Sequence, residues 1–263
     1  MNKEEKWKLD RMGRPTSSKL DDLFTGGSRP STPEELAAYK LVKSLRKTVD
    51  IEFGATAINY LYQLKRERRI KKPHYERSNY NFDYGNEQEV YAVKWLRANH
   101  PELIIRHCSS DDFEEIVFNV HESGLGDSPD GYVNNDTVLE IKCPVDENKI
   151  EEIMDMTKSE AKKEYARQFA GHFLCAPWAT ELLYVVYDGM KDDDPNDLRD
   201  PLSPDRGIIF TYSREEFTEL IAAIEAKVKY VISFLDVVDR GELKADGTKL
   251  RIRDINSWSP LNA

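Results

Sequence analysis

The sequence contains few cysteines and no long apolar run. Its three cysteines, Cys108, Cys143 and Cys175, are widely spaced and odd in number. They fit a reducing, cytosolic setting and are too few for a four-cysteine zinc or iron–sulfur site. No stretch of about 18 apolar residues exists, so no membrane-spanning helix is expected. The charged first residues, Met1 to Lys6, are not followed by the apolar segment of a secretory signal. We therefore expect a cytoplasmic protein without a membrane association.

Basic residues are also fewer than acidic residues. The chain has 38 Lys and Arg against 48 Asp and Glu, a net charge of −10, which argues against a protein that coats nucleic acid non-specifically. The charge is unevenly spread, because residues 40–80 hold eleven Lys or Arg against four acids, a local charge of +7. An acidic protein with one basic segment can still bind a polyanion locally. The basic run 65–72 has two interpretations, a solvated helix end or a surface that contacts DNA phosphates.

Length and pattern predict one mixed α/β domain. The 263 residues, of which 40% are hydrophobic, are enough to fill a sizeable core. Without an internal repeat or a long linker, residues 1–263 are expected to form a single domain. It would comprise an N-terminal helical part of about residues 1–80, a core of about 81–237 and a C-terminal extension of 238–263.

Hydrophobic spacing predicts helices first and then strands interleaved with helices, the order of a mixed α/β fold. A short helix is expected to begin at Thr16 or Ser17 and to end at Leu23. Longer helices are expected over residues 33–47, 53–69, 86–98, 147–156, 158–173 and 214–237. Runs of β-branched and aromatic residues predict strands over 116–120, 138–143, 182–187 and 208–212. The acidic segment 192–205 is interpreted as a solvated insertion, with a partner-docking segment as the alternative.

Two acids and a lysine stand out in the segment from Gly126 to Pro144. Glu140 and Lys142 are two residues apart in a predicted strand, so their side chains project from the same face while Leu139 and Ile141 point to the core. Asp130 lies ten residues before Glu140, in a Pro-Gly turn. A hairpin would bring the two carboxylates together.

Paired carboxylates are costly unless a hard cation joins them, and oxygen ligands suit Mg²⁺ or Mn²⁺. A neighbouring ammonium can orient a metal-bound water, so the set outlines a phosphodiester hydrolysis site. The spacing alone is weak, since a chain of this composition gives roughly a third of one match by chance. The alternative is an ion pair between Glu140 and Lys142 on a half-exposed strand.

Four short motifs occur in order between residues 7 and 188. They are Trp7-x3-Arg11-x-Gly13-x2-Thr16-x-Ser18, Gly85-x3-Glu89-x2-Ala92, Ser128-Pro129-Asp130-Gly131 with Leu139-Glu140-Ile141-Lys142-Cys143-Pro144, and Tyr165-x2-Gln168. Together they resemble the lambda exonuclease (YqaJ) type of phage recombination exonuclease, within the PD-(D/E)XK nuclease superfamily. Pro15 and Ser17 depart from the family pattern, which leaves the shape of the first motif's loop open.

The resemblance implies a restriction-endonuclease-like α/β core, with a central mixed β-sheet flanked by helices. It implies catalytic roles for Asp130, Glu140, Lys142 and Gln168, in which Lys142 positions the attacking water and Gln168 holds the geometry of the site. Two Mg²⁺ ions, replaceable by Mn²⁺, would be bound by Glu89, Asp130, Glu140 and the carbonyl of Ile141.

The resemblance further implies an enzyme that starts at DNA ends. Arg11, Ser18 and Ser128 would hold the 5′-terminal phosphate, and a guanidinium with two hydroxyls suits a phosphate dianion. The expected activity is 5′→3′ degradation of double-stranded DNA, which leaves 3′ tails for a single-strand annealing recombinase. A homo-trimer encoded by a phage or prophage and acting in the bacterial cytoplasm is implied as well. The basic residues expected to contact the incoming duplex are Lys65, Arg66, Arg68 and Arg69.

Other functions stay open at this point. One is an endonuclease or a single-strand-specific nuclease of the same superfamily, although its iron–sulfur types need more cysteines than this chain has. Another is a non-catalytic protein that binds DNA ends. A zinc site is not expected, because His107, His121 and His172 form no HxH or HxxxH pair.

Overall fold

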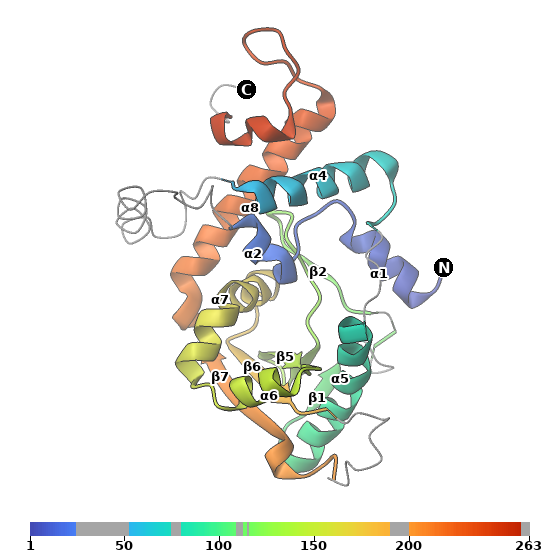
Figure 1. The fold of residues 1–263 in the computed structure, drawn as a ribbon, viewed down its shortest axis with the longest axis vertical. Helices are drawn as coiled ribbons and strands as arrows, with labels where there is room; N and C mark the ends of the chain where they lie inside the picture. The colour runs from blue at the N-terminus through green and yellow to red at the C-terminus, as the bar shows by residue number, and fades with distance from the viewer. Residues whose placement is uncertain (25–52, 75–79, 109–112, 115, 190–199, 259–263) are drawn as a thin grey trace. The chain divides into compact units, whose positions relative to one another are not determined.

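The computed structural model describes residues 1–24, 53–74, 80–108, 113–114, 116–189 and 200–258. The helix predicted over 33–47 and most of the acidic segment 192–205 lie outside these residues. The chain divides into two compact units (Figure 1). The helical unit comprises Met1–His74, Phe118–Asp127 and Thr218–Ala263, and the sheet unit comprises Tyr75–Val117 and Ser128–Phe217. Within the described ranges, no helix is long and apolar enough to cross a membrane.

The helical unit is built around one long helix, α8 (Thr218–Arg240), whose apolar residues recur at helical spacing and are buried. Helix α4 (Ala55–Ile70) packs against α8 and against the short helix α2 (Leu20–Leu23). The remaining elements are α1 (Lys3–Arg11), η1 (Ser17–Lys19), η4 (Ile252–Ser257) and a small ribbon of β2 (Asn119–Val120) with β3 (Gly126–Asp127). Helix α1 begins with a capping box between Asn2 and Glu5.

The sheet unit contains a five-stranded mixed sheet in the order β1-β4-β5-β6-β7. Its strands are β1 (Ile105–His107), β4 (Gly131–Val133), β5 (Thr137–Lys142), β6 (Glu181–Tyr187) and β7 (Gly207–Ser213). Among the described strands of this sheet, β5 and β6 are the pair that runs parallel, and a parallel connection needs a crossover. Helices α6 (Glu147–Met154) and α7 (Lys158–Cys175) supply it. The other helical elements are α5 (Tyr80–Asn99), η2 (Pro204–Arg206) and η3 (Arg214–Phe217).

Helices cover both faces of this sheet. On one face, α5 packs its buried residues, Trp95 among them, against Leu139 and Ile141 of β5. On the other face, the ring of Phe169 in α7 lies 5.1 Å from that of Tyr184 in β6. Alternation along β5 therefore sends its odd-numbered residues toward α5 and its even-numbered residues toward α7. The predicted α/β class, with a central mixed sheet flanked by helices, is confirmed.

Three predicted elements differ in detail. Helix α5 begins six residues early, at Tyr80, whose ring packs 6.1 Å from that of Tyr84 one turn later. The strand expected over 116–120 shrinks to β2, because Val117 bonds Cys108 and Ser128 instead of a neighbouring strand. Thr16 precedes η1, but its side chain does not cap that turn. Its backbone forms a bridge with Gly126.

Candidate active site

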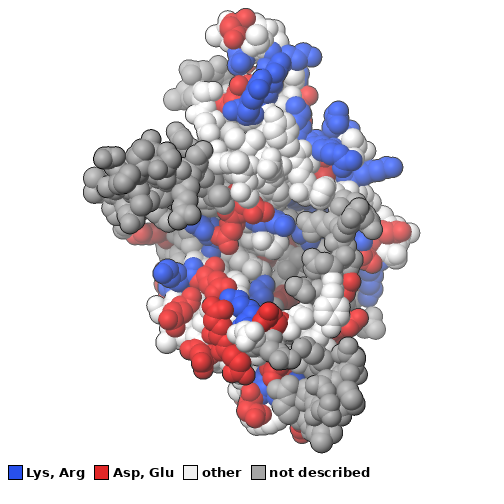
Figure 2. Space-filling view, in the orientation of Figure 1, with Lys and Arg blue, Asp and Glu red and all other residues white. Residues whose placement is uncertain are grey.

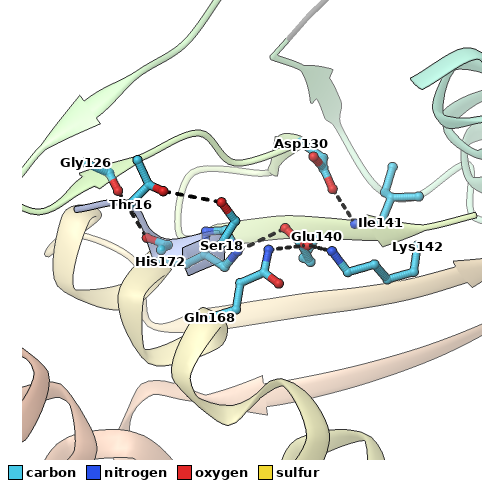
Figure 3. Close-up of polar contacts among 10 residues, drawn as sticks. Thr16, Ser18, Gly126, Asp130, Glu140, Ile141, Lys142, Gln168 and His172 are labelled. Atoms are coloured by element: carbon cyan, nitrogen blue, oxygen red, sulfur yellow. Dashed lines mark hydrogen bonds and ion pairs between the residues drawn. The ribbon is translucent and has the colours of Figure 1, made fainter. Parts of the chain in front are cut away.

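Asp130 is held beside β5 by hydrogen bonds of both its backbone and its side chain. Its carbonyl accepts a hydrogen bond from the Cys108 amide at 2.9 Å, which anchors the residue just before β4. The next residue, Gly131, pairs with Leu139 across the antiparallel β4–β5 hairpin. This register carries the Asp130 carboxylate to β5, where Oδ2 accepts from the Ile141 amide at 2.6 Å (Figure 3). The hairpin that the sequence predicts is therefore present.

Glu140 lies on the central strand, with a side chain that is only 2% exposed. The Lys142 ammonium contacts its Oε1, and Gln168 donates to the same oxygen at 2.6 Å. The second oxygen, Oε2, lies 2.9 Å from Nε2 of His172 (Figure 3). Gln168 and His172 are four residues apart in α7, so they share one helix face. One strand neighbour and one helix face thus fix the orientation of this carboxylate.

Glu89 contributes a third carboxylate from α5. Its Oε1 contacts Nε2 of His107, a buried residue of β1. The charge of Glu89 acts on Asp130, so the sheet unit brings the three predicted acidic ligands within electrostatic reach of one another. Ile141 is also in place through its amide bond to Asp130, and metal ligation by its carbonyl stays a prediction.

The three central side chains have different protonation preferences. Burial, together with the charges of Glu140 and Glu89, raises the pKa of Asp130 well above its usual value. Burial would also raise the pKa of Glu140, but Lys142 and His172 beside it lower that pKa to about 2. For Lys142, burial would lower the pKa, but Glu140 and Asp130 raise it above the usual value. Lys142 is therefore charged at neutral pH, and Asp130 is the carboxylate with too little positive charge around it.

The excess of negative charge around Asp130 fits the binding of a divalent cation. Asp130, Glu140 and Glu89 offer only oxygen atoms, the ligands that Mg²⁺ and Mn²⁺ prefer. A cation among these carboxylates would favour the ionised form of Asp130, which the protein side chains alone do not. The residues present therefore fit the metal that the sequence predicts.

The predicted terminal-phosphate residues are divided between the two units. Arg11 ends α1, and its guanidinium lies 4.3 Å from the ring centre of Trp7, one helical turn earlier. Ser18 lies in η1 of the same unit, with its hydroxyl 3.4 Å from that of Thr16. Ser128 belongs to the sheet unit, where its hydroxyl donates to the Val117 carbonyl at 3.2 Å. Their joint role in phosphate binding stays a prediction.

The predicted DNA-contacting residues lie on the last two turns of α4. Figure 2 shows Lys and Arg side chains gathered where this helix ends. Three of the four residues, Lys65, Arg68 and Arg69, line a pocket of about 470 Å³ together with Lys71, Val238 and Asp239. The Arg68 guanidinium is partly neutralised by Asp236 and Asp239, at 2.8 and 3.1 Å. Contact with DNA stays a prediction for Lys65, Arg66, Arg68 and Arg69.

Sequence reasoning missed His172 and His107. The sequence pattern offers both only as candidate zinc ligands, whereas each contacts a glutamate of the site. For His172 a signal existed, since it lies one helical turn after Gln168 and is directed to the same strand. For His107 there was none, because its contact with Glu89 depends on how α5 packs on β1.

A second group of possible metal ligands, His121, Glu122 and Glu225, lies in the helical unit. The Lys229 ammonium is 2.7 Å from Glu225 and 3.5 Å from Glu122. It already supplies the positive charge there, and His121 Nδ1 accepts a bond from the Ser123 amide. We therefore place the candidate metal site in the sheet unit.

Comparison with solved structures finds the same fold in bacterial exonucleases. The chain is 23% identical to LHK-Exo in complex with dAMP, with a TM-score of 0.60 over 88% of this chain and 92% of that one. The alkaline exonuclease LHK-Exo from Laribacter hongkongensis gives 22% and 0.59 over the same shares. A phage-related exonuclease from Haemophilus somnus 129PT gives 17% and 0.52 over 84% and 95%. No protein-family model and no curated protein matches the sequence.

At these identities the similarity shows the fold. The predicted resemblance to lambda exonuclease-like proteins is confirmed at that level. Because one fold can serve many activities, the function has to be argued from the site.

Proposed function

We propose that the protein is a metal-dependent exonuclease that degrades double-stranded DNA in the 5′→3′ direction. One observation carries the proposal: Asp130 and Glu140 meet on the central strand beside the charged Lys142, and Asp130 lacks sufficient positive charge around it. Two carboxylates and a lysine suit phosphodiester hydrolysis with a divalent cation. The shared fold with proteins described as exonucleases supports the same activity.

In the proposed mechanism, Asp130, Glu140, Glu89 and the Ile141 carbonyl would hold Mg²⁺, which when bound would polarise the scissile phosphate and lower the pKa of water. Gln168 and His172 keep the Glu140 carboxylate in one orientation. Lys142 remains charged and its side chain is 31% exposed, so a water or a phosphate oxygen can reach its ammonium. Lys142 would orient the attacking water and stabilise the negative charge that develops on the phosphate.

The end preference comes from the predicted phosphate site. Arg11, Ser18 and Ser128 would bind the 5′-terminal phosphate, so that cleavage starts at an end and proceeds inward. The resemblance adds further elements to the proposal: a homo-trimer, phage or prophage origin, action in the host cytoplasm, and 3′ tails that pass to a single-strand annealing recombinase. Of the four predicted basic residues, Lys65, Arg66 and Arg69 would contact the duplex backbone, whereas the Arg68 guanidinium binds the Gly13 carbonyl, Asp236 and Asp239.

The experiment is digestion of linear duplexes labelled at either strand end, with a 5′ phosphate or a 5′ hydroxyl, beside a covalently closed circle. We expect loss of the 5′ label first, faster degradation of phosphorylated ends, and an intact circle. Cleavage of the circle at the rate of the linear form would show an endonuclease. Single-stranded DNA degraded in preference to duplex would show a single-strand nuclease, and binding without cleavage would show an end-binding protein.

Arg11→Ala tests the end preference itself. Only an interaction made with the phosphate and absent from the hydroxyl can produce a rate difference between the two ends. Arg11→Ala should therefore bring the ratio of the two rates toward one. Lys8→Ala is the matched control, because Lys8 is an exposed cation on the same helix that pairs with Glu4. If Arg11→Ala slows both end types equally, Arg11 is not a terminal-phosphate ligand.

A further inference from the structure

Gly13 lies between the two residues of the helical unit that are predicted to hold the terminal phosphate, Arg11 and Ser18. Both of its backbone groups are engaged by side chains of α4. Its amide donates to the Glu67 carboxylate at 2.6 Å, and its carbonyl accepts from Nε of Arg68 at 2.9 Å. Glu67 and Arg68 are consecutive residues of one helix, and both hold the backbone of Gly13. They lie 54 and 55 residues after it in the chain.

Glu67 is a buried carboxylate, only 6% exposed. Besides Gly13 it accepts hydrogen bonds from the His74 amide at 3.0 Å and from the Gln63 side chain at 3.2 Å. A buried charge is tolerated only when it is well hydrogen-bonded. Moving Gly13 away would therefore remove a bond that Glu67 needs, which makes this loop position stiff.

Arg68 connects the loop to the long helix of the unit. While Nε holds the Gly13 carbonyl, Nη1 pairs with Asp236 at 2.8 Å and with Asp239 at 3.1 Å on α8. A planar guanidinium can serve these acceptors together, which a lysine ammonium on a flexible stem does less well. The loop is thus braced against α8 through one side chain.

The loop has further attachments beyond Gly13. The Thr16 amide donates to the Tyr60 hydroxyl of α4 at 3.2 Å. The Gly126 amide of β3 donates to the Pro15 carbonyl at 2.8 Å. Between Arg11 and Ser18 the backbone is therefore fixed at three positions, and two of them are held by α4.

We propose that Glu67 and Arg68 are positioning residues that set the geometry of the terminal-phosphate loop, Arg11–Ser18. The inference rests on the proposed function, because it takes Arg11 and Ser18 as ligands of a 5′ phosphate. Neither side chain contacts the DNA in this role. Their contribution is to hold the backbone so that the Arg11 guanidinium and the Ser18 hydroxyl keep a fixed separation, which lowers the cost of ordering them around a phosphate.

The test compares degradation rates of 5′-phosphate and 5′-hydroxyl duplexes by the full-length enzyme with Mg²⁺. Glu67→Gln keeps the shape but removes the charge-assisted bond to Gly13. Arg68→Lys keeps the positive charge but removes the Nε bond. Each should lower the phosphate-to-hydroxyl ratio by about tenfold, the size of one charge-assisted hydrogen bond. Rates on hydroxyl ends should change less than about twofold, because that reaction does not use the phosphate ligands.

Matched controls are Glu4→Gln and Arg240→Lys, the same exchanges at exposed ion pairs of α1 and α8. Both should keep the wild-type ratio. Arg68→Lys also separates positioning from general DNA attraction, since a residue that acts by charge alone would tolerate lysine. If Glu67→Gln fails to fold, Asp236→Ala replaces it, because it removes one α8 acceptor of Arg68 from a side chain that is 48% exposed.

The outcomes distinguish this inference from the proposed function. A wild-type ratio of one overturns the terminal-phosphate site and the inference with it. A high wild-type ratio that Arg11→Ala abolishes, but that Glu67→Gln and Arg68→Lys leave unchanged, overturns the inference alone. Equal slowing of both end types by the α4 variants would mean that Glu67 and Arg68 only support folding, which also overturns it.

Discussion

The two units hold their candidate functional residues in different ways. In the sheet unit, the candidate catalytic residues Glu140, Lys142 and Gln168 lie on regular elements, β5 and α7, and Asp130 directly precedes β4. In the helical unit, the loop Arg11–Ser18 has little regular structure, and its shape depends on side chains from residues 44 to 55 positions later. The first arrangement follows from local periodicity, and the second depends on tertiary contacts.

The comparison also separates two kinds of functional effect. Changes at Glu140, Lys142 or His172 of the sheet unit should alter the chemical step and slow cleavage from both types of DNA end equally. Changes at Arg11, at Ser18 or at the residues that hold their loop should alter the discrimination between phosphorylated and unphosphorylated ends, as should changes at Ser128 of the sheet unit. Variants in each unit can therefore test whether the functions are divided as the residues suggest.

Among variants that keep both central carboxylates, the largest effect is expected at Lys142. Lys142→Ala removes the ammonium beside Glu140 and should slow cleavage on the order of 10²-fold or more, the usual loss of one preorganised stabilising group. Lys142→Arg should not restore the rate, because the guanidinium is bulkier and differently shaped. Single-turnover rates on both end types measure this. A rate near that of the wild type would show that Lys142 forms a simple ion pair with Glu140. A changed ratio of the rates on phosphorylated and hydroxyl ends would contradict the division of functions between the two units.

The two central carboxylates should respond oppositely in stability. Without metal, Asp130→Asn should raise the free energy of unfolding at pH 7 by about 1 kcal/mol, because it removes a carboxylate whose ionised form is disfavoured. Glu140→Gln should lower it by about 2–3 kcal/mol, because Lys142 and His172 lose a buried partner. Urea titrations of both variants in EDTA measure the difference. A lower stability for Asp130→Asn would contradict the interpretation that the ionised form of Asp130 is disfavoured without metal.

These carboxylates also show how far the sequence could predict the site. Alternation along β5 places Glu140 and Lys142 on one face, and the β4–β5 hairpin places Asp130 beside them. This geometry follows from local rules, and the structure contains it. For His172 the sequence offers only its spacing of one helical turn from Gln168, and its contact with Glu140 depends also on the packing of α7 over β5. The Glu67 and Arg68 contacts with Gly13 had no signal in the sequence, because the basic run around them predicts solvent or DNA contact equally well. Thr16 looked like a helix cap, yet its backbone joins β3 instead.

A smaller effect is expected at Gly13, in the helical unit. Its φ of +72° lies in the left-handed region, and an added Cβ would lie 2.5 Å from Cγ of Arg68. Gly13→Ala should therefore shift the loop and lower the phosphate-to-hydroxyl ratio by about fivefold to tenfold, with the rate on hydroxyl ends largely retained. Gly241→Ala is the control, since it adds a Cβ at a φ of +74° with no atom nearby. An unchanged ratio for Gly13→Ala would show that the loop tolerates displacement.

The smallest effect is expected at His172, which orients Glu140 without facing the DNA. His172→Ala should slow cleavage about threefold on both end types, since Gln168 and Lys142 still hold the other carboxylate oxygen. His172→Gln should recover part of the rate by restoring a donor, which a purely space-filling role would not explain. His100→Ala, at an exposed pair with Glu102, is the control. Loss of end preference in His172→Ala would contradict its placement in the chemical step.

The most direct test of the account is metal dependence. Linear duplex should survive incubation with the wild-type enzyme in EDTA, and excess Mg²⁺ or Mn²⁺ should restore degradation, whereas Ca²⁺ should support little or none. Asp130→Asn should stay inactive with every metal while it still binds duplex DNA in Ca²⁺. Sustained cleavage by the wild type in chelated buffer, or full activity of Asp130→Asn, would contradict a metal-dependent site at Asp130 and Glu140.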